Sequence, residues 1–149
     1  MFCIHPLIKY LSRSPYSNEK LEKTLSLLKN ENIIFKKSGN MIIFKYNTEG
    51  KYGGILQRSC RGTIIDIDNL SLICSSIEGS YSYEEFKENV PINYCVIEEN
   101  IEGTLINVYY YKNHWNVSTK FCINADESRF KNNQTYRQIF DKYIDINKV

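Results

Sequence analysis

The sequence predicts one α+β domain in which antiparallel sheets are flanked by helices. Three observations support this fold class. The chain has 149 residues, which is enough for a single domain with a buried core, expected here to cover residues 1–149. Short apolar runs rich in β-branched and aromatic residues are separated by turn residues, as in hairpins. Apolar residues recur at helical spacing near both ends of the chain.

Two helices are expected before the first strand. Residues 7–11 form a short opening helix, and a second helix begins after Ser17, whose hydroxyl can accept a hydrogen bond from the first turn. The second helix ends at residues 30–32. Three leucines fall on one stripe of it and are expected to face the core: Leu21, Leu25 and Leu28.

The middle of the chain reads as strands joined by tight turns and two longer loops. The longer loops cover residues 47–54, which contain three glycines, and residues 78–89, with a helical turn near residues 84–86. The apolar runs between the turns predict the following strands: 33–37, 41–46, 63–67, 70–75, 94–98, 104–111 and 115–121.

A last helix is expected near the C-terminal end of the sequence. Its apolar residues have the spacing i, i+3, i+4 and i+7: Tyr136, Ile139, Phe140 and Tyr143. Either Asn133 or Thr135 is suited to cap its start.

Charge and cysteine content restrict the classes of function. The net charge of +2 is too small to imply nucleic-acid binding by itself, and the early lysines are interpreted as a solvated helix face followed by a strand edge. The five cysteines lack the spacing of a zinc site, so no metal site is predicted and a reduced, cytoplasmic compartment is expected. The sequence has no signal peptide and no apolar run of membrane-spanning length, so a membrane is not an expected partner.

Three segments in a fixed order carry the functional information. They are residues 60–66 (CRGTIID), residues 74–81 (CSSIEGSY) and residues 98–106 (EENIEGTLI), and the last leads into an aromatic strand and then into residues 115–121 (WNVSTKF). This succession, over about residues 30–125, resembles the adenylyltransferase domain of ATP-dependent RNA ligases of the T4 RNA ligase 1 type. The resemblance implies a partial nucleotidyltransferase fold and a site for a nucleotide.

The resemblance assigns roles to particular residues. In that family, the third segment reads Lys-x-Asp-Gly-Ser-Leu, and its lysine attacks the α-phosphate of ATP. Asn100 stands at the lysine position, and Glu102 takes the place of the aspartate. A guanidinium offers a fork of donors to a phosphate, and a strand-end lysine offers a point charge. The resemblance implies nucleotide binding for five residues: Arg61, Gly62, Glu102, Gly103 and Lys120.

The departures from the family pattern predict loss of catalysis. A carboxamide such as that of Asn100 is not a nucleophile for phosphoramidate formation. The Arg-Pro and Lys of the second segment are Ser75-Ser76 and Gly79, and Phe121 follows Lys120 where the family has glycine. The sequence also ends before the family's later glutamate and Lys-x-Lys motifs. The chain is therefore expected to be a pseudoenzyme, with ATP and Mg²⁺ as cofactors only if activity survives.

Alternatives remain open on the sequence. Arg61 also suits a structural ion pair, and Glu102-Gly103 also suits a plain turn. The chain could instead be an active RNA ligase that uses another lysine, such as Lys112 or Lys120, or that a second chain completes. A third function is a protein-interaction scaffold that keeps only the fold. The partners compatible with these hypotheses are a nucleotide, RNA, and a homodimer or protein partner that covers an open sheet edge.

Overall fold

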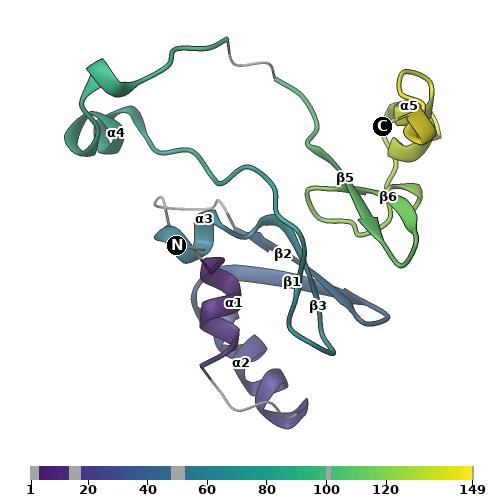
Figure 1. Cartoon of the computed structure of the whole chain (residues 1–149), viewed down its shortest axis with the longest axis horizontal. Helices are drawn as coiled ribbons and strands as arrows, with labels where there is room; N and C mark the ends of the chain where they lie inside the picture. Colours follow the sequence, from purple (N-terminus) through teal and green to yellow (C-terminus); the bar gives the residue numbers. More distant parts are fainter. Residues whose placement is uncertain (1–3, 14–17, 48–52, 100–101, 149) are drawn as a thin grey trace.

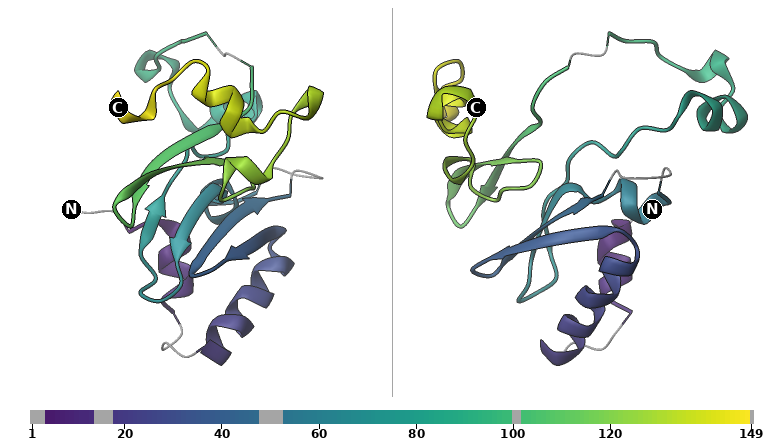
Figure 2. Two further views of the ribbon diagram at one scale, coloured as in Figure 1. Left: turned by 90° about the vertical axis from the view of Figure 1, so that its right-hand side faces the viewer. Right: turned by 180° about the vertical axis from the view of Figure 1, so that it is seen from behind.

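The computed structural model describes residues 4–13, 18–47, 53–99 and 102–148. The architecture is α+β, with two antiparallel sheets stacked between helices, as the sequence predicts. Helices α1 and α2 cover one face of a four-stranded sheet, a two-stranded hairpin faces its other side, and α5 lies on the outer side of the hairpin (Figure 1 and Figure 2). Each interface between layers has its own apolar core.

The first core lies between the two N-terminal helices and the large sheet. Helix α1 spans Pro6–Leu11 and α2 spans Asn18–Asn30. The predicted leucine stripe of α2 is buried, which confirms that face of the helix. The cap predicted at Ser17 lies outside the described residues. The fully buried Phe44 of the sheet also belongs to this core.

The large sheet has the order β1-β2-β3-β4, with every neighbouring pair antiparallel. Its strands are β1 (Ile33–Ser38), β2 (Met41–Tyr46), β3 (Arg61–Asp66) and β4 (Leu72–Cys74), close to the predicted ranges. Alternate residues face opposite layers. Ile42 and Ile65 pack with the helices, whereas Ile43 and Ile64 pack with the hairpin.

The second sheet is the hairpin of β5 (Ile106–Tyr111) and β6 (His114–Thr119). After it come the short turns η2 (Ala125–Glu127) and η3 (Lys131–Asn133), then α5 (Tyr136–Asp141) and η4 (Ile146–Lys148). Thr135, rather than Asn133, caps α5, and its side chain forms a capping box with Gln138. The predicted helix is shorter than expected, because Tyr143 lies beyond the end of α5 and is 83% exposed. Tyr143 nevertheless lines the same apolar surface as Tyr136, Ile139 and Phe140.

Between β4 and β5, the described residues 75–99 and 102–105 form the two limbs of a long arch away from the sheets (Figure 1). It contains α4 (Tyr83–Asn89) and the turn η1 (Ile92–Tyr94), while α3 (Ile55–Arg58) precedes β3. The loop predicted over residues 78–89 is therefore partly wrong, because a capping box of Ser82 and Glu85 starts a full helix. The strand predicted at 94–98 is also wrong. Its apolar residues are exposed, and no described strand pairs with this segment, so it gains no ladder hydrogen bonds.

A polar network ties the turns of three hairpins together at one end of the layers. The Tyr111 hydroxyl donates to Asp66 Oδ2 over 2.6 Å, and Asn40 Nδ2 contacts both Asp66 Oδ2 (3.2 Å) and the Tyr111 oxygen (2.8 Å). Lys112 Nζ donates to Asn40 Oδ1 over 3.1 Å. These contacts fix the tip of the hairpin on the large sheet.

We expect Thr135→Ala to lower the free energy of unfolding by about 1 kcal/mol, because the Thr135 hydroxyl accepts from the backbone N–H of Gln138 at the start of α5. Urea denaturation followed by circular dichroism measures this loss. Thr104→Ala, at an exposed residue before β5, is the matched control and should change stability by less than about 0.5 kcal/mol. Equal effects of the two substitutions would contradict a capping role for Thr135.

Among the described residues, no helix has both the length and the apolar character that a bilayer-spanning segment requires.

Candidate functional site

The large sheet and the hairpin approach each other closely at Gly62, at the start of β3. Gly62 has a φ of +78°, and a Cβ atom placed on it would lie 3.3 Å from both the Cα and the carbonyl oxygen of Lys120. The same atom would lie 3.2 Å from Asn107 Nδ2. Glycine is required here because the conformation is left-handed and the neighbouring backbone leaves little room. This approach brings the predicted residues Arg61, Gly62 and Lys120 together.

Three cationic side chains meet beside Gly62. Lys45 of β2 is the cross-strand partner of Arg61, and Lys120 follows the end of β6. The pKa of Lys120 is lowered, first by burial and then by the positive charges of Arg61 and Lys45. Positive charge is therefore concentrated beside Gly62.

Two aromatic rings lie among these cations. The Lys120 Nζ atom is 5.9 Å from the centre of the Tyr46 ring. Beyond it, the ring of Phe121 has the Nζ atoms of Lys45 and Lys36 at 4.4 Å and 4.5 Å from its centre. We refer to four residues as the basic cluster: Lys36, Lys45, Arg61 and Lys120.

The basic cluster has no carboxylate partner among the described residues. The ion pairs of that part of the chain involve other cations: Lys37, Arg58, Arg137 and Lys148. Within the same ranges, Arg61 therefore forms no structural ion pair of the kind the sequence left open. Grouped cations without balancing carboxylates favour an anionic ligand.

The remaining predicted residues lie apart from this cluster. Glu102 and Gly103 are exposed on the limb of the arch that leads into β5, and a Cβ atom on Gly103 would meet open space. Over the described ranges, the structure records no hydrogen bond or ion pair between Glu102 and the basic cluster. Asn100 lies outside the described residues. The nucleotide-binding role of Glu102 and Gly103 therefore stays a prediction.

Gly79 of the second motif lies against Tyr46. A Cβ atom at Gly79 would be 2.7 Å from the Tyr46 hydroxyl oxygen, so any side chain there would have to displace that ring. The Gly79 N–H donates to the Arg58 carbonyl oxygen over 3.1 Å. The Tyr46 hydroxyl thus occupies the space that a side chain at this position would need.

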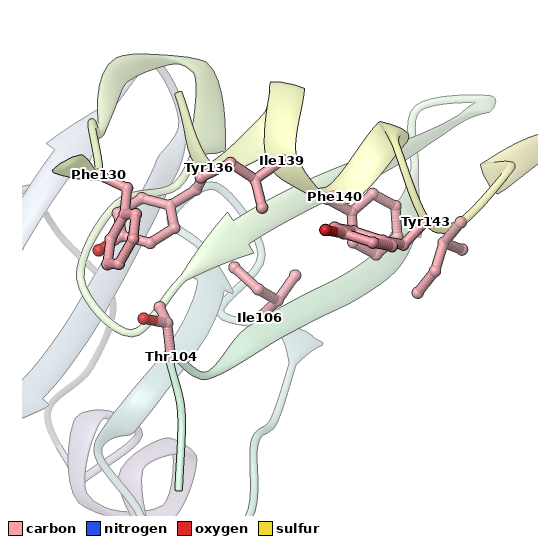
Figure 3. A pocket seen from close by; sticks show the side chains of 8 residues that line it. Thr104, Ile106, Phe130, Tyr136, Ile139, Phe140 and Tyr143 are labelled. Atoms are coloured by element: carbon pink, nitrogen blue, oxygen red, sulfur yellow. The ribbon is translucent and has the colours of Figure 1, made fainter. Parts of the chain in front are cut away.

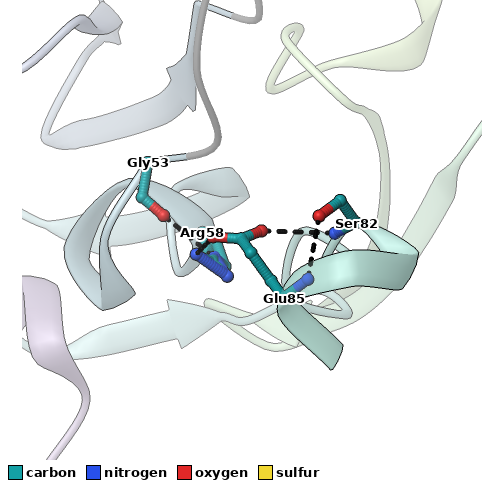
Figure 4. A network of polar contacts seen from close by, with 4 residues as sticks. All are labelled: Gly53, Arg58, Ser82 and Glu85. Carbon is teal, nitrogen blue, oxygen red and sulfur yellow. Dashed lines mark hydrogen bonds and ion pairs between the residues drawn. The ribbon is translucent and has the colours of Figure 1, made fainter. Parts of the chain in front are cut away.

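Arg58 is a buried charged residue that the sequence analysis missed. Its side chain joins α3 to the start of α4: Nε donates to the Gly53 carbonyl oxygen over 2.9 Å, and Nη2 lies 3.4 Å from Glu85 Oε1 (Figure 4). The guanidinium also lies 3.8 Å from the centre of the Tyr81 ring, and Arg58 is 7% exposed. These contacts hold the arch on the body of the domain. Nothing in the sequence around Arg58 distinguishes it from a surface arginine.

An apolar pocket lies between the hairpin and α5. It has a volume of about 290 Å³, and its walls include Ile106, Phe130, Tyr136 and Phe140 (Figure 3). The lining carries hydroxyl groups but no carboxylate, imidazole, thiol or amine. It therefore suits an apolar contact rather than acid–base chemistry.

The described ranges contain cysteines and other potential metal ligands. In those ranges, no group of three or more histidine, cysteine or acidic side chains is placed to hold a metal ion. Cys60 and Cys74 are free and buried, and burial raises the pKa of Cys60 to about 12. A thiol of that pKa is not a useful nucleophile.

Comparison with known proteins gives two distant relatives of viral origin. The chain is 24% identical, over 165 aligned positions, to an RNA ligase of Rhodothermus phage RM378, covering 89% of this chain and 37% of the ligase. It is 32% identical over 98 residues to an immediate-early protein ICP-46 homolog of Invertebrate iridescent virus 3, covering 57% of this chain and 21% of that protein. The chain thus spans well under half the length of either relative. No family model matches the sequence, and no solved structure matches it significantly.

Proposed function

We propose that the chain is an RNA-ligase-like nucleotidyltransferase domain that binds a nucleotide or the phosphate of an RNA end and does not form a covalent adenylate. The proposal proceeds from the distant similarity to a phage RNA ligase. The observation that carries it is the basic cluster, in which Arg61 and Lys120 meet at Gly62 without a described carboxylate partner.

The chemistry of these side chains suits a phosphate. The Arg61 guanidinium can donate two parallel hydrogen bonds to phosphate oxygens, and Lys120 can approach the same group as a point charge. The lowered pKa of Lys120 reflects burial and repulsion by Arg61 and Lys45, which a bound phosphate would offset. Ligand binding is therefore expected to raise that pKa again.

Two other positions, Asn100 and Gly79, explain why catalysis is not expected. Adenylyl transfer needs an amine in line with the α-phosphate, and Asn100 offers only an amide. The second motif has lost its lysine at Gly79, where the Tyr46 hydroxyl now occupies the nearby space. Electrostatic stabilisation is the main catalytic contribution in phosphoryl transfer, so these losses remove both the nucleophile and part of the stabilisation.

Arg61→Gln is expected to weaken binding of 5′-AMP at least tenfold, because it removes a charged fork of donors from the cluster. Isothermal titration calorimetry measures the affinity. Arg13→Gln is the matched control: Arg13 is exposed just after α1, which packs in the first core, and this variant should bind AMP like the wild type. Absence of AMP binding by the wild-type chain would contradict nucleotide binding.

The purified chain incubated with labelled ATP and Mg²⁺ should acquire no covalent AMP, as checked by intact-mass spectrometry. The variant Asn100→Lys places an amine where the family has its nucleophile, and gain of a stable adenylate would indicate that the rest of the pocket is functional. A covalent adenylate on the wild-type chain would contradict the proposal and favour an active ligase.

A second candidate function is protein interaction, favoured by the apolar pocket beside α5 and by the exposed apolar residues of the arch. Tyr94, Val96 and Ile97 are each at least 85% exposed, which is unusual for side chains without a partner. Sedimentation velocity at increasing concentration tests whether the partner is a second copy of the chain. A concentration-independent monomer would exclude self-association.

A further inference from the structure

We propose that the pocket between α3 and α4 recognises a peptide segment that offers a neutral backbone carbonyl beside an aliphatic side chain. The pocket has a volume of about 430 Å³, and its described walls are Arg58, Tyr81, Glu85, Phe86 and Val90. None of these residues belongs to the basic cluster. The inference is therefore independent of the proposed nucleotide binding.

The Arg58 guanidinium has one amino group left without an acceptor. Its Nε donates to the Gly53 carbonyl oxygen over 2.9 Å, and its Nη2 lies 3.4 Å from Glu85 Oε1 (Figure 4). The Nη1 atom is buried and has no hydrogen-bond partner in the described part of the chain. A buried donor without an acceptor destabilises the state in which it is left. A ligand that brings an acceptor to Nη1 would remove this cost.

The charge of the site favours a neutral acceptor over an anion. The Glu85 carboxylate lies beside the Arg58 guanidinium, so the two charges offset each other. A second carboxylate or a phosphate at Nη1 would be repelled by Glu85. The same side chain already binds a neutral backbone carbonyl, that of Gly53, through Nε. A second carbonyl oxygen is therefore the acceptor that suits the remaining amino group.

The other walls of the pocket offer apolar and aromatic surface. Phe86 and Val90 are four residues apart at the end of α4 and lie on the same side of it. The Arg58 guanidinium lies over the Tyr81 ring, 3.8 Å from its centre. Val90 is 36% exposed and Tyr81 is 49% exposed, so part of this surface is open to solvent. An aliphatic side chain next to the bound carbonyl would bury it, as in sites where a few polar groups orient a mostly apolar ligand.

Three small probes separate the parts of this chemistry. N-acetyl-leucinamide carries neutral carbonyls and an aliphatic side chain, and it is expected to bind with a dissociation constant on the order of millimolar, as suits a ligand of about a dozen non-hydrogen atoms. N-acetylglycinamide lacks the side chain and should bind about tenfold more weakly. N-acetylleucine replaces the amide by a carboxylate and should bind about threefold more weakly. NMR titration of the full chain, followed at the backbone amides of residues 58 and 85–90, measures all three affinities.

Two variants test the walls of the pocket. Arg58→Lys keeps the charge but removes the planar fork of donors, and it should weaken binding of N-acetyl-leucinamide about tenfold. Because Arg58 also holds the arch, Val90→Asp tests the pocket with Arg58 intact. It places a charge in the apolar wall and should weaken binding about tenfold as well. Ile92→Asp makes the same kind of change at a residue that is 70% exposed and does not line the pocket, so its affinity should match that of the wild type. Circular dichroism melting of each variant checks that the fold is retained.

Each possible result bears on a different part of the inference. Tighter binding of N-acetylleucine than of N-acetyl-leucinamide would identify an anion site and overturn the neutral acceptor. Equal binding of N-acetyl-leucinamide and N-acetylglycinamide, or an unchanged affinity in Val90→Asp, would overturn the role of the apolar wall. No response of residues 58 and 85–90 to any probe would overturn the inference as a whole. Titration of the same sample with 5′-AMP tests nucleotide binding separately, so failure of one proposal is distinguishable from failure of the other.

Discussion

Gly62→Ala is expected to lower the free energy of unfolding by about 2 kcal/mol and to weaken AMP binding along with it. The alanine would hold a left-handed backbone conformation, and its methyl group would press on the backbone of Lys120 at 3.3 Å. A backbone cannot move aside as a flexible side chain can, so the end of β6 would shift away from β3. The distance between Arg61 and Lys120 would then change, so the two side chains could no longer bind the proposed phosphate together. Urea denaturation and calorimetric titration with AMP measure the two effects.

Gly39 provides the matched control for this substitution. It also has a left-handed conformation, with a φ of +57°, but a Cβ atom there would meet nothing within 4 Å. Gly39→Ala should therefore cost only the backbone strain, about 1 kcal/mol, and leave AMP binding unchanged. Equal losses for the two variants, with AMP affinity intact in both, would show that the contact between Gly62 and Lys120 does not position the site.

Asp66→Ala is expected to lower the free energy of unfolding by about 3 kcal/mol, which is more than the loss expected for Gly62→Ala. Asp66 is 6% exposed, and its carboxylate accepts from the Tyr111 hydroxyl, the Asn40 amide and the backbone N–H of Asp68. Removing the carboxylate leaves these donors with no equivalent acceptor and frees the tip of the hairpin from the large sheet. Urea denaturation at neutral pH measures the loss.

The control for Asp66→Ala is Asp68→Ala. Asp68 is exposed, and its side chain has only a 3.5 Å contact with Asn40, so this variant should lose no more than about 0.5 kcal/mol. A comparable loss in both variants would indicate that general charge in this turn, rather than the buried acceptor, stabilises the fold.

The contribution of Asp66 should also depend on pH. Burial pushes the pKa of Asp66 upward, but hydrogen bonds from Tyr111 and from the backbone at Asp68 and Asn69, together with the charge of Lys112, outweigh it, so the pKa lies below the ordinary value of 3.8. A lowered pKa in the folded state means that the unfolded chain binds the proton first. The stability difference between wild type and Asp66→Ala should be full above about pH 5 and shrink as the pH falls below about 4. A difference that stays constant down to pH 3 would contradict this.

The sequence predicted most of the strands because its short apolar runs and turn residues are local signals. The leucine stripe of α2 and the strand pairs β1-β2, β3-β4 and β5-β6 follow from spacing and turn residues. The strand expected at 94–98 failed because β-branched residues favour a strand only where a neighbouring strand can pair. The helix α4 could have been found, since Ser82 and Glu85 have the spacing of a capping box.

The candidate site was predictable only in part. The resemblance placed Arg61, Gly62 and Lys120 in one site, and the structure brings them together, whereas no local pattern indicated that Lys36 and Lys45 would share the ring of Phe121. The early lysines were interpreted as a solvated helix face followed by a strand edge, and Lys36 and Lys37 are both exposed on the edge strand β1. That interpretation did not indicate that Lys36 would lie on the ring of Phe121. Which of two adjacent lysines faces a neighbouring sheet depends on how the layers stack, and that is a tertiary property.

The hairpin is attached to the large sheet at both ends, by Gly62 against Lys120 at one and by Asp66 with Tyr111 at the other. Two attachment points prevent rotation of the hairpin relative to the large sheet. The backbone positions that carry the basic side chains are therefore set before a ligand binds. Association should then be a simple one-step encounter, with a rate that rises in proportion to ligand concentration and shows no slow isomerisation. Hydrogen exchange at the amides of β5 and β6 should likewise be nearly the same with and without ligand.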